Sequence, residues 1–282
     1  MINAPSLIIN SLDGYPLAAH YFEGEGDAAI VFASATAVPQ TLYFKLAQEL
    51  SKQGFHVYTF DYSGIGASLS GSLKDNNRSM FHWGEQDLEA VLRYTFKQHS
   101  RIYLAGHSVG GQIFSFAPSS AQLSGAYFLA SQSAYYKHWQ GWNRFKVKLF
   151  WALLLPISSQ ILGYMPGFIM GSPESLSKAA AYSWKEFAHH AKGSLGLIPQ
   201  ALERANKFAY PIKMRALKND DTLSPLSSVQ ALFQEFCSAN AQLLYEDSNG
   251  WEGIGHFDFF RSKNNMLWPD LINFFLECEE KF

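Results

Sequence analysis

Cysteine and charged residues are scarce in this 282-residue chain: there are two cysteines, and charged residues make up 16% of the sequence. Cys237 and Cys278 lie far apart and outside any Cys-x-x-Cys spacing, which indicates free thiols in a reducing compartment rather than a disulfide framework. A formal net charge of −2 provides no basic field for a nucleic-acid backbone. The first ten residues lack the basic segment and long apolar run of a signal peptide. We therefore expect a cytoplasmic protein that binds no nucleic acid.

Apolar residues are plentiful: hydrophobic residues make up 48% of the chain, enough for a large core. Leu149–Gly171 contains no charged residue and is long enough to cross a bilayer. Pro156, Pro166 and a Ser-Ser-Gln sequence interrupt it, so we expect two short helices joined by a turn and no integral membrane span. Three basic residues beside this segment are interpreted as a solvated helix face rather than a membrane-binding patch: Arg144, Lys146 and Lys148.

Apolar segments typical of strands alternate with segments of helical spacing. The expected strands are Leu7–Ile9, Leu17–Phe22, Ala28–Ala33, His56–Phe60, Arg101–Ala105, Gly125–Ala130, Ile212–Leu217 and Gln242–Tyr245. The expected helices are Gln40–Gln53, Trp83–Gln98, Pro225–Phe236 and Asn265–Glu280. This alternation predicts an α/β fold whose mostly parallel sheet has helices on both faces. Residues 131–210 show no strand signal, so we expect a helical cap there, inserted into a core of residues 1–130 and 211–282.

The most informative motif is Gly106–Gly110, a Gly-x-Ser-x-Gly sequence that directly follows an expected strand and precedes a segment able to open a helix. A serine on a sharp strand-to-helix turn is the nucleophile elbow of serine hydrolases. The turn strains the backbone of Ser108, and small residues are needed two positions before and after it. The helix behind Ser108 would aim its first N–H groups, that of Val109 included, at a developing oxyanion.

A serine hydroxyl also needs a base, and the base needs an acid that fixes its tautomer. Asp220 and Asp221 follow the expected strand Ile212–Leu217, and His256 follows the last expected strand. Both positions lie at carboxyl ends of strands, where open α/β sheets build their sites. Serine, acid and histidine therefore occur in the order that this class of hydrolase uses.

With these motifs the chain resembles the α/β-hydrolase superfamily over nearly its whole length, and within it the capped esterases, lipases and monoacylglycerol-lipase-like or serine-aminopeptidase-like hydrolases. Tyr62–Gly66 and Gly255–Arg261 are similar to a bacterial branch of predicted hydrolases. In this superfamily the acid often lies four residues before a proline. That spacing implies Asp221, with Pro225 four residues on, rather than Asp220.

The resemblance also bears on the second oxyanion donor and on one structural arginine. Alignment of the loop after Ala28–Ala33 implies the backbone N–H of Thr36 as the donor beside that of Val109, with Ala37 as the competitor. Relatives usually carry arginine at the position of Ser63. That arginine is generally structural, so we expect a changed ion-pair network here rather than lost catalysis.

Neither a metal nor a cofactor is expected. His189 and His190 point about 100° apart on a helix and are poor joint ligands. Gly64-Ile65-Gly66 lacks the third glycine of a dinucleotide fingerprint. Aromatic residues of the cap segment are the candidates for a substrate pocket, with packing of the cap onto the core as the alternative: Tyr135, Trp139, Trp142 and Trp184.

Together these features predict a serine hydrolase that cleaves a partly hydrophobic, small-molecule carboxylic ester through Ser108, His256 and Asp221. The same three residues would also support acyl transfer or cleavage of an amide or peptide bond. A non-catalytic ligand-binding protein of the same fold is the alternative from another class; an incomplete triad would be its usual sign. Fold alone does not identify the substrate.

Overall fold

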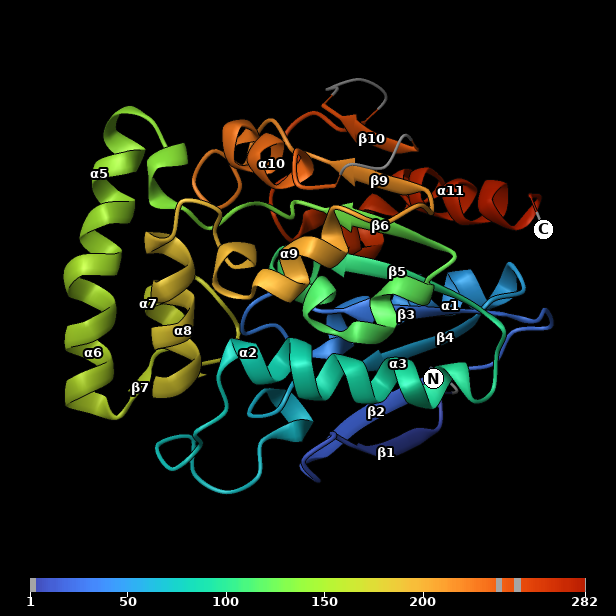
Figure 1. Cartoon of the computed structure of the whole chain (residues 1–282), viewed down its shortest axis with the longest axis horizontal. Coiled ribbons are helices and arrows are strands. Elements are labelled where there is room, and N and C mark those ends of the chain that lie inside the picture. The colour runs from blue at the N-terminus through green and yellow to red at the C-terminus, as the bar shows by residue number, and fades with distance from the viewer. Residues whose placement is uncertain (1–3, 237–239, 246–249, 282) are drawn as a thin grey trace.

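A computed structural model of the chain describes residues 4–236, 240–245 and 250–281. Its eight-stranded sheet has the order β1-β2-β4-β3-β5-β6-β9-β10 and is parallel except at β1 and β2 (Figure 1). The strands are β1 Ser6–Asn10, β2 Pro16–Phe22, β3 Ala28–Ala33, β4 His56–Phe60, β5 Arg101–His107, β6 Gly125–Leu129, β9 Ile212–Arg215 and β10 Ala241–Leu244. The expected α/β class, with a mostly parallel sheet, is confirmed, and each expected strand is present within three residues of its predicted ends.

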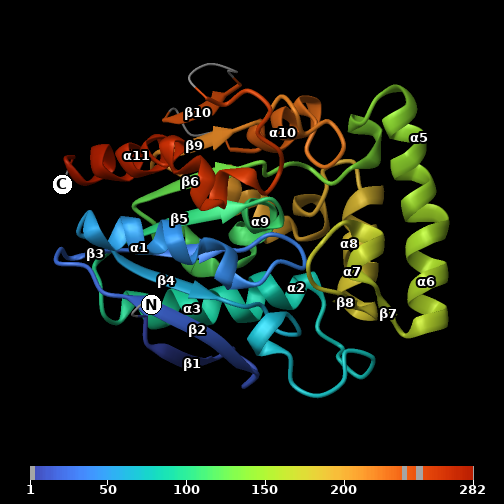
Figure 2. The ribbon, with the colours of Figure 1, turned by 180° about the vertical axis from the view of Figure 1, so that it is seen from behind.

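Helices cover both faces of this sheet (Figures 1 and 2). Those of the core are α1 Phe44–Lys52, α2 Met80–His82, α3 Glu89–Phe96, α4 Val109–Ile113, α10 Leu226–Phe233 and α11 Pro269–Glu279. A π-helical turn, Trp83–Leu88, joins α2 to α3, so the helix expected at Trp83 begins three residues earlier. Short 3-10 turns also occur: Gln40–Tyr43, Gly66–Ser68, Phe114–Phe116, Pro118–Gln122, Tyr136–His138, Leu195–Leu197, Asp258–Phe260 and Ser262–Leu267.

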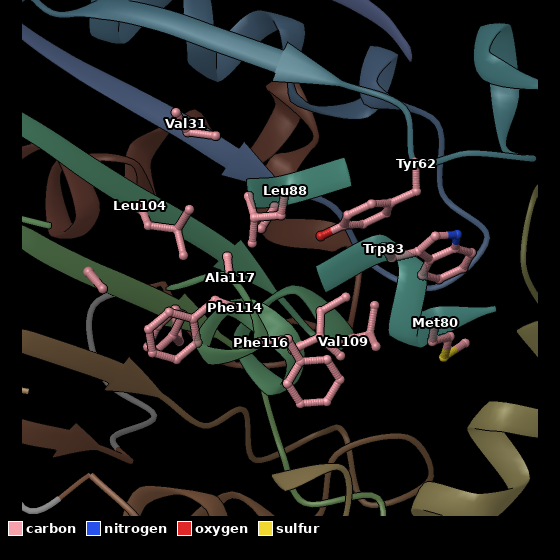
Figure 3. Packing of buried hydrophobic residues seen from close by; sticks show 14 of the residues in the cluster. Val31, Tyr62, Met80, Trp83, Leu88, Leu104, Val109, Phe114, Phe116 and Ala117 are labelled. Atoms are coloured by element: carbon pink, nitrogen blue, oxygen red, sulfur yellow. The ribbon is translucent and has the colours of Figure 1, made fainter. Parts of the chain in front are cut away.

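Strand β3 shows why the sheet needs helices on both sides. All six of its residues are buried, and alternate side chains point to opposite faces. Val31 joins a cluster that includes Leu88 of the π-helical turn, Leu92 of α3 and Val109 of α4, part of which is seen in Figure 3. Ile30, Phe32 and Ala28 join the other cluster, formed with α1 and α11. The sheet is thus the middle layer of three, and β5 is held rigidly next to β3 at its centre.

Residues 131–210 contain α5 Gly141–Leu149, α6 Leu155–Leu162, α7 Gly167–Met170, α8 Lys178–His189 and α9 Pro199–Ala205. A two-residue antiparallel pairing, β7 Tyr164–Met165 with β8 Leu176–Ser177, is an addition that the sequence did not predict. The α5–α6 segment stands at one end of the molecule, and α7 and α8 lie between it and the sheet (Figures 1 and 2).

Two helices joined by a turn are present in Leu149–Gly171 as expected, but the break lies after both Pro156 and the Ser-Ser-Gln sequence: α6 ends at Leu162, and α7 begins at Gly167. Gly141–Leu162 is one helix of 22 residues, long and apolar enough to cross a membrane by length and composition. Its middle, Phe150–Leu154, is a π-helical turn, and Pro156 lies in the first turn of α6 behind it. The wider turn accommodates a proline, which has no N–H to donate to the preceding turn. The helix ends instead at Gly163, whose φ of 79° forms a left-handed cap.

Of the two cysteines, Cys278 is buried in α11 as a free thiol, and burial raises its pKa to about 11. Its thiol is therefore protonated at neutral pH and unreactive. Cys237 lies outside the described residues.

Candidate active site

Ser108 occupies the turn between β5 and α4. Its φ of 52° and ψ of −115° are an uncommon conformation for a residue with a side chain. The turn is fixed from outside: the Ser108 N–H donates to the Leu129 carbonyl of β6 at 3.0 Å, and the Ser108 carbonyl accepts from the Gly111 N–H at 3.2 Å. Strain held in place by surrounding hydrogen bonds is typical of functional positions.

The two glycines of the motif are required by space. A Cβ atom at Gly110 would lie 2.1 Å from the Ala33 carbonyl oxygen of β3, and one at Gly106 would lie 2.6 Å from the Phe128 ring. The first of these neighbours is backbone of a central strand, so it cannot move aside cheaply. Residues this small allow α4 to begin directly against the sheet, with Ser108 at its N-terminus.

The side chains of His256 and Asp220 form a short, buried hydrogen bond. Nδ1 of His256 lies 2.5 Å from Oδ2 of Asp220, and the two side chains are buried to 6% and 4% exposure. This contact corrects the sequence-based choice of Asp221, whose side chain is exposed on the next position of the loop. A carboxylate on Nδ1 directs the other ring nitrogen, Nε2, away from the acid.

The local backbone explains why the neighbouring residue was the wrong choice. The Ser224 N–H donates to the Asp220 carbonyl at 2.8 Å, closing a turn in the loop that follows β9. The first residue of this turn faces the core and the second faces solvent. The acid therefore lies five residues before Pro225, one more than the spacing used for the prediction.

A second histidine, the fully buried His107, contacts the backbone of His256. Nε2 of His107 lies 2.9 Å from the His256 carbonyl, which can only accept, so this nitrogen carries the proton. Nδ1 of His107 then accepts from the Tyr43 hydroxyl at 3.0 Å. Burial and the nearby His256 hold the pKa of His107 well below its usual range, so the ring stays neutral. His107 thus both packs beneath the site and donates a hydrogen bond to the backbone of His256.

We expect His107→Phe to reduce any activity that depends on His256 without abolishing it. The substitution leaves the His256 carbonyl buried without its donor, which costs about 1–3 kcal/mol of unfolding free energy. A small displacement of His256 would lower kcat by about 10- to 100-fold. Steady-state kinetics and thermal unfolding measure both effects, and Tyr43→Phe, which removes the hydroxyl one step further away, should have the smaller effect on kcat. If kcat were unchanged although the His107→Phe protein was destabilised, His107 would have a packing role only.

The loop after β3 brings its backbone to Ser108. Ala35 donates its N–H to the Tyr43 hydroxyl at 2.9 Å, so this amide already has a partner. Thr36 and Ser108 line the same small cavity, whereas Ala37, with a φ of 55°, is buried and is not part of that lining. Of the two candidates for the second oxyanion donor, this arrangement favours Thr36.

Two adjoining cavities lie at this site. The smaller, of about 40 Å³, is lined by Ser108 and His256 together with Gln112 and Phe257. The larger, of about 200 Å³, is lined mainly by apolar side chains of residues 131–210. The lining residues common to both are Gln132, Met170, Trp184 and Leu223. An apolar ligand in the larger cavity would therefore reach Ser108 past these four side chains.

The structure brings two of the four pocket candidates to these cavities. Trp184 lines both, and Trp139 lines the larger one while its ring N–H donates to the Thr222 carbonyl at 2.8 Å. Trp142 is 66% exposed and stacks on Phe145, so its assignment to the pocket was wrong. Tyr135 contacts the rings of its chain neighbours and lies outside the lining of both cavities. Trp139 lies before α5 and Trp142 lies in its first turn, so the two rings have different surroundings, which composition does not reveal.

An ion-pair network surrounds Ser63. The Ser63 hydroxyl donates to the buried Asp87 carboxylate at 2.6 Å and accepts from Nε of Arg78 at 3.0 Å. The same guanidinium lies 3.2 Å from Asp87 and also pairs with Asp13. The cation of this network is thus supplied from position 78. The sequence indicated that a partner was missing but not where its substitute would come from.

The sheet order, the elbow at the centre of the sheet and the cavity beside residues 131–210 are those of an α/β-hydrolase. The family model described as serine aminopeptidase, S33, matches residues 24–248, most of the chain. The chain therefore belongs to this family of hydrolases.

Solved structures with the same fold include several hydrolases. Alpha/beta hydrolase domain-containing protein 10 from mouse matches with a TM-score of 0.67, at 15% identity over 99% of each chain. A monoacylglycerol lipase from Paleococcus ferrophilus matches with a TM-score of 0.63, at 15% identity over 93% of this chain and 99% of that one. A Pyrococcus furiosus esterase matches with a TM-score of 0.64, at 15% identity over 100% and 92%. No curated protein sequence matches the chain.

Proposed function

We propose that this protein is a serine esterase that cleaves carboxylic esters through an acyl-enzyme, with Ser108 as nucleophile, His256 as general base and Asp220 as the acid that orients it. The observation that carries the proposal is the buried 2.5 Å contact between Asp220 and His256, whose ring lines the same cavity as the strained Ser108. A histidine held at Nδ1 by a carboxylate offers Nε2 to the serine.

The reaction would run in two steps. Ser108 Oγ attacks the ester carbonyl while His256 Nε2 takes its proton, and the N–H groups of Val109 and Thr36 stabilise the oxyanion. The intermediate collapses as His256 returns the proton to the departing alcohol, leaving an acyl group on Ser108. Water then attacks the acyl group with His256 again as base, which releases the carboxylic acid and restores Ser108.

The cavity lining favours an ester with a partly hydrophobic acyl or alcohol group. Phe150, Trp151 and Ile169 are among the apolar side chains of the larger cavity, and Lys146 is its one charged lining residue among the described residues. Esterases and a monoacylglycerol lipase are among the proteins of similar fold, which agrees with such a substrate. Residues 131–210 would act as the cap that shapes this cavity, and the reducing cytoplasm remains the proposed location.

The family description gives cleavage at a peptide N-terminus as the second candidate. An aminopeptidase has to bind the free ammonium group of its substrate, which calls for a carboxylate close to the nucleophile. Among the described residues, the lining of the two cavities contains no Asp or Glu. The site therefore favours neutral esters over peptides. Acyl transfer stays possible chemically wherever an alcohol replaces water as the acceptor.

Labelling with a fluorophosphonate tests the nucleophile, and a p-nitrophenyl ester series tests the substrate. We expect the wild type to be labelled and to hydrolyse esters with a defined chain-length optimum. Ser108→Ala should lose labelling and about 10⁶-fold in kcat. Aminoacyl p-nitroanilides are the comparison substrates. Faster cleavage of these than of esters would assign the protein to peptidases, and a folded wild type that neither labels nor turns over would indicate a ligand-binding protein.

A further inference from the structure

The outer face of the helix Gly141–Leu162 is apolar and exposed, the reverse of what a surface helix of a soluble domain shows. Only 17% of its most apolar 18-residue window is buried. The helix forms the outermost layer of the molecule, beyond α7 and α8 (Figure 2). Its outer row is defined as six side chains, with exposures in parentheses: Trp142 (66%), Phe145 (52%), Leu149 (38%), Leu153 (50%), Ile157 (53%) and Ile161 (76%).

The helix has two opposite apolar rows. The inner row, residues 147, 151, 155 and 159, is wholly or partly buried, and Trp151 meets Trp184 of α8 edge to face at 4.7 Å. Residues 145, 149, 153, 157 and 161 repeat with the same four-residue period and are offset by two positions, about 200° around the helix. The outer row therefore faces directly away from the protein and needs a different partner.

Charge indicates what that partner is. The helix carries Arg144, Lys146 and Lys148, which the sequence alone favoured as a solvated face but which lie beside the exposed outer row. The sequence has no Asp or Glu between Glu89 and Glu174. A second copy of the helix would bring the same cations and no anion. A surface of anionic lipid supplies both the phosphate groups that basic side chains bind and the acyl chains that apolar ones enter.

We propose that the outer row is a membrane-contact surface: the helix lies flat in the interface of an anionic bilayer, with the outer row among the acyl chains. The helix is about 33 Å long, so it offers a continuous strip rather than a point contact. Its inner row remains packed on α8, which is incompatible with crossing the bilayer in this arrangement. Phe150 and Trp151 of the same helix line the larger cavity, so lipid contact and the cavity lie on opposite sides of one helix.

Vesicle co-sedimentation tests the proposal. The full chain carrying Ser108→Ala is used throughout, so binding is read independently of any ester hydrolysis. We expect binding to vesicles that contain phosphatidylglycerol and weaker binding to pure phosphatidylcholine. Ile157→Glu and Ile161→Glu should each weaken binding at least about 10-fold, because an apolar group is replaced by a charge. Lys148→Gln should weaken it about fivefold on anionic vesicles only. Met266→Glu is the matched control, since Met266 is 68% exposed and lies outside the outer row.

Two further measurements distinguish a bilayer from other possible partners of the outer row. The tryptophan emission maximum of the protein should shift to shorter wavelength when anionic vesicles are added, because Trp142 enters the bilayer interface. The Trp142→Phe variant should lose most of that shift. Circular dichroism should show every variant folded, because the substituted side chains are exposed. The proposal is overturned if the folded protein does not bind anionic vesicles, or if the outer-row variants bind them as strongly as the Met266→Glu control does. It is equally overturned if the protein forms a dimer that Ile157→Glu dissociates, since the outer row would then cover a second copy.

Discussion

Asp220→Asn is expected to lower ester hydrolysis by about 10⁴-fold, whereas Asp221→Asn should retain activity within about threefold of the wild type. The two aspartates are adjacent, but only Asp220 contacts His256, and its side chain is 4% exposed. An amide at position 220 can present its N–H₂ to Nδ1 and stabilise the wrong tautomer, with the proton on Nε2. It also removes the negative charge that stabilises the protonated His256 during the reaction.

The measurement is kcat for one p-nitrophenyl ester across wild type, the two Asn variants and Ser108→Ala. Because Ser108 and His256 act as a unit with the acid, combining Asp220→Asn with Ser108→Ala should cost little beyond Ser108→Ala alone. Thermal unfolding controls for loss of structure. If Asp221→Asn carried the large loss instead, the spacing-based assignment would be restored and the buried contact would have only a structural role.

The contrast between these two residues shows what sequence reasoning reaches here. The elbow at Ser108 was predictable because a strand, two glycines and a helix start are all local signals. His256 was predictable because it follows the serine and the acid in the sequence order typical of this class of hydrolase. The choice between Asp220 and Asp221 was not, because it depends on a turn closed by a hydrogen bond between Ser224 and Asp220. Of these two adjacent residues, Asp220 faces the core and Asp221 faces solvent.

The position of the break after the outer helix was mispredicted for a related reason. Pro156 signals a break in sequence, but a π-helical turn in front of it absorbs the proline. Trp142 counted as a pocket candidate by composition, although helical periodicity places it opposite the inner row. These errors concern which way a residue faces, which tertiary packing decides. Strands β3 and β6, whose residues are all buried, carried no such ambiguity.

A second large effect is expected at Arg78. Asp87 is buried and accepts hydrogen bonds from the N–H and the hydroxyl of Ser63, and Arg78 supplies its cationic partner. Arg78→Met would leave this carboxylate without a counter-charge, which should cost about 3–5 kcal/mol of unfolding free energy at pH 8. The pairing with the half-exposed Asp13 adds little, because solvent screens it.

The loss should depend on pH in a direction set by Asp87. Burial raises the pKa of Asp87 to about 6, above the ordinary 3.8, so the native state binds more protons than the unfolded state between these values. Stability contributed by this group is therefore highest at low pH and falls as pH rises through 6. Removing Arg78 raises that pKa further, so Arg78→Met should destabilise the protein much less at pH 5 than at pH 8.

Urea unfolding of four proteins at both pH values measures this: wild type, Arg78→Met, Asp87→Asn and the double variant. Asp87→Asn removes the buried charge while keeping an acceptor for the Ser63 N–H. In the Arg78→Met background it should recover most of the stability lost at pH 8 and abolish the difference between pH 5 and pH 8. A loss that is equal at both pH values and unrelieved by Asp87→Asn would show that Arg78 acts through packing and Asp13. Recovery would instead show that Arg78 acts as the counter-charge of Asp87.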